Sequence, residues 1–152
     1  MPYSRLFYHF IWSTKNREPI ITQHFEKELF PYFQIKANEI DCTILEINGT
    51  DDHIHIIIEI PPKYSISQVV QKLKGTTSYK FSELYWQRGY GALSVSERNL
   101  TAAIDYVRNQ KDHHFQQNII SKFERCDDDD VVIKNSIHEP ISIYNHDQGL
   151  DF

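Results

Sequence analysis

A chain of 152 residues, 40 % hydrophobic and 24 % charged, has the length and composition of one ordinary globular domain. Its two cysteines exclude a disulfide framework, and its longest apolar run, residues 54–60, is too short to cross a bilayer. With no segment typical of a signal peptide, these features predict a protein of a reducing compartment, the cytoplasm.

The net charge of −5 argues against a nucleic-acid partner, but the distribution of charge weakens this objection. Residues 1–115 are neutral, and the whole excess of acid lies in residues 116–152, which include the run Asp127 to Asp130. A neutral domain can still carry a local basic groove. We therefore divide the chain into a catalytic domain, residues 1–115, and an acidic tail, residues 116–152, whose role is unknown.

Hydrophobic periodicity and turn residues predict seven elements in this domain. In chain order they are a strand over residues 6–13, a helix over 22–37, strands over 42–47 and 53–60, a helix over 67–85, a strand over 89–95 and a helix over 96–114. Thr22, Ser67 and Ser96 are the expected caps, and Pro31 is expected to kink or split the first helix. The order predicts an α+β fold, a ferredoxin-like (RRM-like) antiparallel sheet with helices on one face, to which the last helix is added.

The strand over residues 53–60 separates two sets of side chains. Because side chains alternate along a strand, the isoleucines at even positions share the core face, and His53 and His55 lie on the other. Two imidazoles on one strand face can bind a single metal ion. The same pattern also fits two half-exposed histidines on a sheet surface.

The last predicted helix carries Tyr106 and Gln110, which are four residues apart and therefore share one face. Small and polar neighbours, Ala102 and Asn99 among them, leave the phenol room to meet a substrate. A tyrosine packed at the edge of the core also fits this spacing.

The motifs occur in a fixed order: His53-Ile54-His55, then Gly89-Tyr90-Gly91-Ala92, then Tyr106-Val107-Arg108-Asn109-Gln110. Over about residues 3–115, this order and spacing resemble the single-tyrosine HUH transposases (histidine, hydrophobic residue, histidine). These are the TnpA-type enzymes of small bacterial insertion sequences, relatives of the REP-associated tyrosine transposases. The resemblance implies a bacterial or archaeal enzyme, nucleoid-associated when bound to DNA, that cleaves and rejoins single-stranded DNA at imperfect hairpins through a 5′-phosphotyrosine.

The resemblance also implies a catalytic site. His53, His55 and Gln110 become ligands of a divalent metal, Mg²⁺ or Mn²⁺, and Tyr106 becomes the nucleophile. Two imidazoles and an amide suit Mn²⁺ at least as well as Mg²⁺, which prefers oxygen ligands. Because the family's proteins are commonly dimers, we expect a homodimer, in which the tyrosine helix can serve the partner's histidine pair.

Basic and aromatic side chains on the second predicted helix and in two loops are candidates for phosphate binding and base stacking. They are Lys15, Arg17, Lys72, Lys74, Lys80, Arg88, Trp86 and Tyr90. A solvated basic face beside core aromatics would contain the same residues.

Two other functions suit the same fold. A non-catalytic, domesticated protein that binds hairpin or single-stranded nucleic acid needs neither metal nor nucleophile. A metal-dependent hydrolase needs a general base, and Glu59 is the only carboxylate on the histidine face of its strand. A covalent protein–DNA adduct distinguishes the transposase from both.

Overall fold

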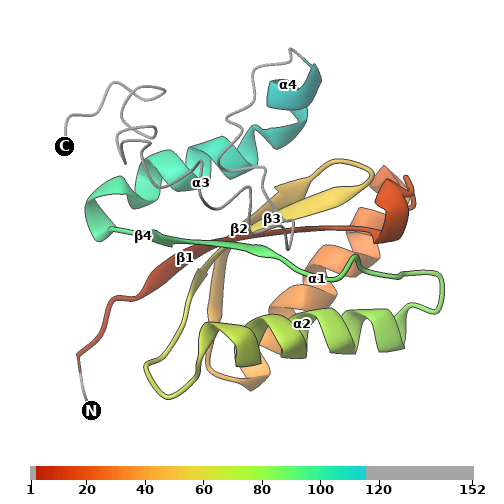
Figure 1. Cartoon of the computed structure of the whole chain (residues 1–152). Coiled ribbons are helices and arrows are strands. Elements are labelled where there is room, and N and C mark those ends of the chain that lie inside the picture. Colours follow the sequence, from red (N-terminus) through yellow and green to blue (C-terminus); the bar gives the residue numbers. More distant parts are fainter. Residues whose placement is uncertain (1–2, 116–152) are drawn as a thin grey trace.

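Four antiparallel strands form one sheet in the computed structural model, which describes residues 3–115 (Figure 1). The strand order is β2-β3-β1-β4, which confirms the predicted ferredoxin-like α+β fold. The acidic run at residues 127–130 lies outside the described residues. The elements are β1 (Phe7–Ser13), η1 (Lys15–Arg17), α1 (Gln23–Glu39), β2 (Thr43–Gly49), β3 (His53–Glu59), α2 (Ile66–Lys80), β4 (Gly91–Val95), η2 (Glu97–Asn99), α3 (Leu100–Arg108) and α4 (Gln110–Phe115).

The two faces of the sheet carry two separate cores. Helices α1 and α2 pack against each other and cover one face, where the even-numbered isoleucines of β3 meet Phe10 and Trp12 of β1. Helix α3 lies over the opposite face (Figure 1), where Ile57 and Phe7 pack against Ala103. The predicted alternation of β3 is therefore confirmed, and burial on both faces explains its nearly continuous apolar run.

The boundaries of α2 differ from the predicted ones. The helix is capped by Ser65 rather than Ser67, because Ser65 Oγ accepts a hydrogen bond from the Gln68 backbone N–H and Gln68 Oε1 accepts one from the Ser65 N–H. This reciprocal pair is a capping box. At its other end the helix stops at Lys80, because Phe81 leaves helical geometry with φ −108° and ψ 100°.

The predicted last helix is broken into three pieces. Ser96 caps η2 as expected, α3 ends at Arg108, and Asn109, with φ −96° and ψ 20°, separates α3 from α4. By contrast, α1 begins after its predicted cap Thr22 and is not split at Pro31. Pro31 is exposed, and so is Lys27, whose carbonyl loses its helical partner. Within residues 3–115, no helix combines the length and apolar character needed to span a membrane.

Candidate active site

The predicted histidine pair lies on the face of β3 that α3 covers. His53 and His55 are 2 % and 0 % exposed, and their ring centroids are 5.2 Å apart. Both rings are inside the protein, so the pair is not a half-exposed surface feature. Because buried polar side chains need hydrogen-bond partners, the contacts of each ring indicate what it is arranged to do.

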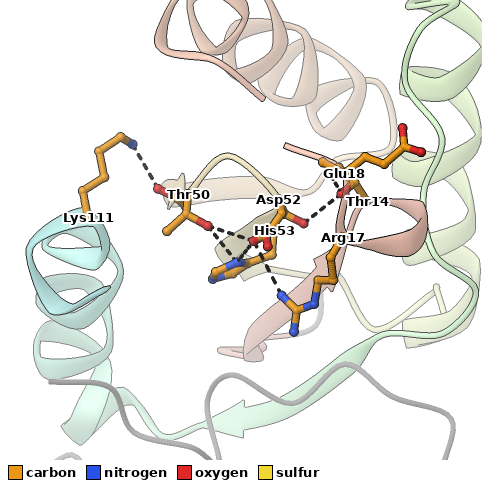
Figure 2. Close-up of polar contacts among 8 residues, drawn as sticks. Thr14, Arg17, Glu18, Thr50, Asp52, His53 and Lys111 are labelled. Carbon is orange, nitrogen blue, oxygen red and sulfur yellow. Dashed lines mark hydrogen bonds and ion pairs between the residues drawn. The ribbon is translucent and has the colours of Figure 1, made fainter. Parts of the chain in front are cut away.

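His53 is held through its Nδ1 atom. This atom lies 2.7 Å from Oδ1 of Asp52 and 2.8 Å from Oγ1 of Thr50, both in the turn between β2 and β3 (Figure 2). The hydrogen bond from His53 lowers the pKa of the Asp52 carboxyl, and the Arg17 guanidinium, 3.6 Å from Asp52 Oδ1, acts in the same direction. With Nδ1 bonded to a carboxylate, a metal would be bound through Nε2 of His53.

His55 is held through the same ring atom by a residue that sequence reasoning did not select. Its Nδ1 lies 2.8 Å from Nε2 of His9 on β1, and both side chains are buried. The ladder pairs Ile11 with His55, so His9, two residues away, is on the same face of the neighbouring strand. The alternation of residues 6–13 could have placed His9 on one face, but only the pairing of β1 with β3 brings it to the histidine pair.

Tyr106 comes from α3 and packs over these rings. Its ring centroid lies 6.1 Å from that of His55 and 6.3 Å from that of His9, and the ring stacks on His113 of α4 at 4.7 Å. The side chain is 1 % exposed, so the prediction of open space around the phenol is wrong for this structure. His113 lies beyond the break at Asn109 and covers the tyrosine, which is therefore shielded from solvent.

Gln110 is the first residue of α4 and is completely buried. The next residue ties α4 to the end of β2: Lys111 Nζ lies 2.5 Å from Asn48 Oδ1, 3.1 Å from the Gly49 carbonyl oxygen and 2.8 Å from Glu26 Oε1. Asn48 Nδ2 also donates to the Arg108 carbonyl oxygen at 2.8 Å. These contacts, which sequence reasoning missed, hold the start of α4 beside the strand end that pairs with β3.

The donor set defines which metal site is possible. Within residues 3–115, no group of three His, Cys, Asp or Glu side chains could hold a metal ion. A site at the histidine pair would therefore need a different third ligand, for which the buried amide of Gln110 or an oxygen of the substrate has the right chemistry. Both imidazoles fit such a site, because each has Nδ1 hydrogen-bonded to a neighbour, as metal-binding histidines usually have.

Five of the eight predicted DNA-binding residues line one groove. Its volume is about 760 Å³, and it lies between α2 and the segment over residues 85–90. Lys15, Lys74, Arg88 and Tyr90 line it together with Trp86, and none of its described lining residues is Asp or Glu. The groove is therefore basic and aromatic, although the chain as a whole is acidic.

The other three predicted DNA-binding residues lie elsewhere. Arg17 pairs with Asp52, and Lys72 lies 3.6 Å from Glu39 of α1. Lys80 is the last residue of α2 and does not line the groove. Within the groove, Lys74 donates to the carbonyl oxygens of Gln87 and Gly89, both at 2.8 Å, and so shapes its wall.

The ferredoxin-like sheet is the fold that the resemblance to transposases implies, and on it a buried histidine pair lies beneath a helix tyrosine. The sequence model of one family, "Transposase IS200 like", matches residues 2–110, so the chain belongs to the IS200-like transposases. The resemblance found in the sequence is confirmed, and the protein is a transposase.

Similar proteins agree with this assignment. The chain is 29 % identical over 115 residues to the transposase for insertion sequence element IS200 of Salmonella typhimurium, covering 68 % of this chain and 75 % of that protein. It is 23 % identical over 120 residues to the ISDra2 transposase TnpA of Deinococcus radiodurans, covering 71 % and 86 %.

Two solved structures share the fold. A crystal structure described as a transposase from Deinococcus radiodurans R1 has a TM-score of 0.57 at 23 % identity, covering 72 % of this chain and 93 % of that one. A REP-associated tyrosine transposase bound to a REP hairpin has a TM-score of 0.60 at 14 % identity, covering 75 % and 72 %. At these identities the likeness concerns the fold alone.

Proposed function

We propose that this transposase cleaves and rejoins single-stranded DNA at hairpin-marked element ends through a 5′-phosphotyrosine on Tyr106. The site would bind Mg²⁺ or Mn²⁺ through His53, His55 and Gln110. The observation that carries the proposal is the packing of the Tyr106 ring against His55, with 6.1 Å between centroids. A helix tyrosine and a strand histidine far apart in sequence thus meet on one face of the sheet.

In the proposed reaction the tyrosine and the metal site have different roles. A tyrosine hydroxyl is a poor nucleophile at neutral pH, because its pKa is roughly 10. A bound divalent cation would lower the cost of forming phenolate and polarise the scissile phosphate. Tyr106 Oη attacks the phosphorus, the bond to the 3′ oxygen breaks, and the strand ends as a 5′-phosphotyrosine and a 3′-hydroxyl. A second 3′-hydroxyl can reverse this step, which rejoins DNA without ATP.

Access to Tyr106 requires a movement, because the side chain is buried. The ring that stacks on it, His113, belongs to the short helix α4, which is joined to α3 through the non-helical residue Asn109. We infer that α4 turns about Asn109 when DNA enters. The polar contacts of Lys111 and Asn48 oppose this movement in the free protein.

We further propose that the basic groove holds the hairpin or unpaired bases. Lys15 and Arg88 supply charge for phosphates, and Trp86 and Tyr90 supply rings for stacking. The groove lies on the α2 side of the sheet, and the histidine pair lies on the α3 side, so binding and cleavage would use different faces. Arg17, Lys72 and Lys80 remain candidate phosphate contacts outside it.

A homodimer is proposed as the working form. What supports it is strand β4, which ends the sheet order and leaves one edge unpaired by any described strand. A sheet edge is a ready template for pairing with another chain. Light scattering of the purified protein tests this proposal, and a monomer at micromolar concentration would contradict it.

The reaction is tested by incubating the protein with single-stranded hairpin oligonucleotides from its element ends and Mn²⁺ or Mg²⁺. We expect a covalent adduct on denaturing gels that is lost in Tyr106→Phe and with a chelator. Tyr79→Phe is the matched control, because Tyr79 is 92 % exposed and would be labelled by non-specific chemistry. Hairpin binding without any adduct would instead establish a non-catalytic binding protein.

A further inference from the structure

The two histidines of the pair have different hydrogen-bond partners among the described residues. His53 has a carboxylate on Nδ1, whereas His55 has another imidazole, that of His9. The His9 and His55 rings are 5.1 Å apart between centroids, with 40° between their planes, and the His9 side chain is 1 % exposed. His9 is therefore built into the core beneath Tyr106, where an ionisable side chain costs stability unless it is hydrogen-bonded.

The hydrogen bond between the two rings has two possible directions. A neutral imidazole has one N–H donor and one acceptor nitrogen. If His55 Nδ1–H donates to His9, the lone pair of His55 lies on Nε2, where a metal can take it. If His9 donates instead, His55 Nε2 carries the proton and cannot be a ligand. The two tautomers therefore differ in whether His55 can bind a metal.

We propose that His9 is a positioning residue that accepts the hydrogen bond from His55 Nδ1 and so presents His55 Nε2 to a divalent metal. This inference rests on the proposed function, since it takes His55 as a ligand. The hydrogen bond to His9 also restricts rotation of the His55 ring, because the two side chains come from strands, β1 and β3, that are directly paired. Partners of this kind typically contribute 10- to 100-fold to metal affinity.

The test uses four substitutions and Mn²⁺ alone, without DNA. His9→Leu fills the space but cannot accept a hydrogen bond, whereas His9→Gln places an amide oxygen near the position of Nε2. His24→Leu is the matched control, because His24 is exposed on α1. Free Mn²⁺ is measured by electron paramagnetic resonance, and urea unfolding checks that each variant is folded.

We expect His9→Leu to weaken Mn²⁺ binding by about 10- to 100-fold, His9→Gln to recover most of the loss and His24→Leu to have no effect. A folded His9→Leu variant that binds Mn²⁺ like the wild type would overturn the inference. His55→Ala separates the two proposals: if wild type binds no more tightly than His55→Ala, the metal site itself is wrong and the role of His9 falls with it. If only His55→Ala loses binding, the metal site stands and His9 has no role.

A second measurement needs no substitution at His9. Nitrogen-15 NMR of the wild-type imidazoles, with diamagnetic Mg²⁺ present, reports which nitrogen of His55 carries the proton. The inference predicts a protonated Nδ1 on His55 and an unprotonated Nε2 on His9. The opposite assignment would overturn it even if His9→Leu does not fold.

Discussion

Gly49, at the end of β2, offers a sharp test of how the hairpin positions His53. A Cβ atom at this position would lie 2.1 Å from the carbonyl oxygen of His53 and 2.9 Å from Cα of Ile54. Ordinary contacts between carbon atoms lie at about 3.5–4.0 Å, and both clashing atoms belong to the backbone, so a rotamer change cannot relieve the clash. Gly49→Ala must therefore move the start of β3 by an ångström or so.

We expect Gly49→Ala to cost about 3 kcal/mol of unfolding free energy, the upper part of the usual range for overpacking, and to weaken Mn²⁺ binding because His53 moves. Gly75→Ala is the matched control. Apart from its chain neighbours and the backbone of its own helix, no atom lies within 4 Å of its Cβ position in the middle of α2. Gly75→Ala should therefore stabilise the protein by about 0.5–1 kcal/mol. Urea unfolding followed by circular dichroism measures both. A Gly49→Ala protein as stable as the wild type would refute the predicted crowding of the hairpin.

Three further predictions concern contacts outside the hairpin backbone. Asn48→Ala removes the donor to the Arg108 carbonyl oxygen and the acceptor for Lys111 Nζ of α4, so it should lower the free energy of unfolding in urea by about 2 kcal/mol. Substitution of the exposed Asn38 by alanine should lower it by less than about 0.5 kcal/mol. Equal costs would contradict the role of Asn48. Burial raises the pKa of the Cys42 thiol to about 11, so at pH 8 iodoacetamide should modify it far more slowly in the native protein than in urea; mass spectrometry showing equal rates would contradict its burial. The hydrogen bond from His53 lowers the pKa of Asp52, so the stabilising effect of this carboxylate is full above pH of about 4 and is lost as the pH falls through the folded-state value. The stability advantage of wild type over Asp52→Asn in urea should therefore shrink as the pH is lowered below about 4, and a constant difference would argue against the carboxylate–histidine bond.

The local sequence pattern was sufficient to predict the strands of the sheet and the first residues of most helices. The alternation of residues 53–60 depends on neighbouring residues only, and β3 forms over nearly the predicted range and pairs with β2. The predicted cap of α2 was wrong because two nearby serines are both suitable caps. Only Ser65 has a glutamine three residues later, which completes a capping box. That signal was present in the sequence.

The break after α3 could not be predicted in this way. Residues 96–114 have a helical pattern throughout, and the interruption at Asn109 coincides with a hydrogen bond from Asn48, more than fifty residues earlier, to the last carbonyl of α3. Such long-range contacts override local propensity. The same break brings His113 onto Tyr106, so the burial of the tyrosine also escaped prediction.

For the site, the sequence indicated which residue types matter but not how they are held. His53 and His55 were placed together by strand alternation alone, whereas His9 joins them through strand pairing. Composition did not show which of the basic residues lie close together. Lys74 and Arg88 share a groove, but Lys72, two residues from Lys74, turns toward Glu39 because a helix directs these side chains apart.

The identity of the residue that becomes covalently attached to DNA tests the central proposal most directly. After cleavage of a hairpin oligonucleotide with Mn²⁺ present, the adduct would be digested with protease and nuclease and its peptides analysed by mass spectrometry. Among the nine tyrosines, only Tyr106 should carry a nucleotide, joined through its 5′ phosphate, and the released strand should end in a 3′-hydroxyl. A nucleotide on any other residue, or a 3′-phosphate linkage, would contradict the proposed mechanism.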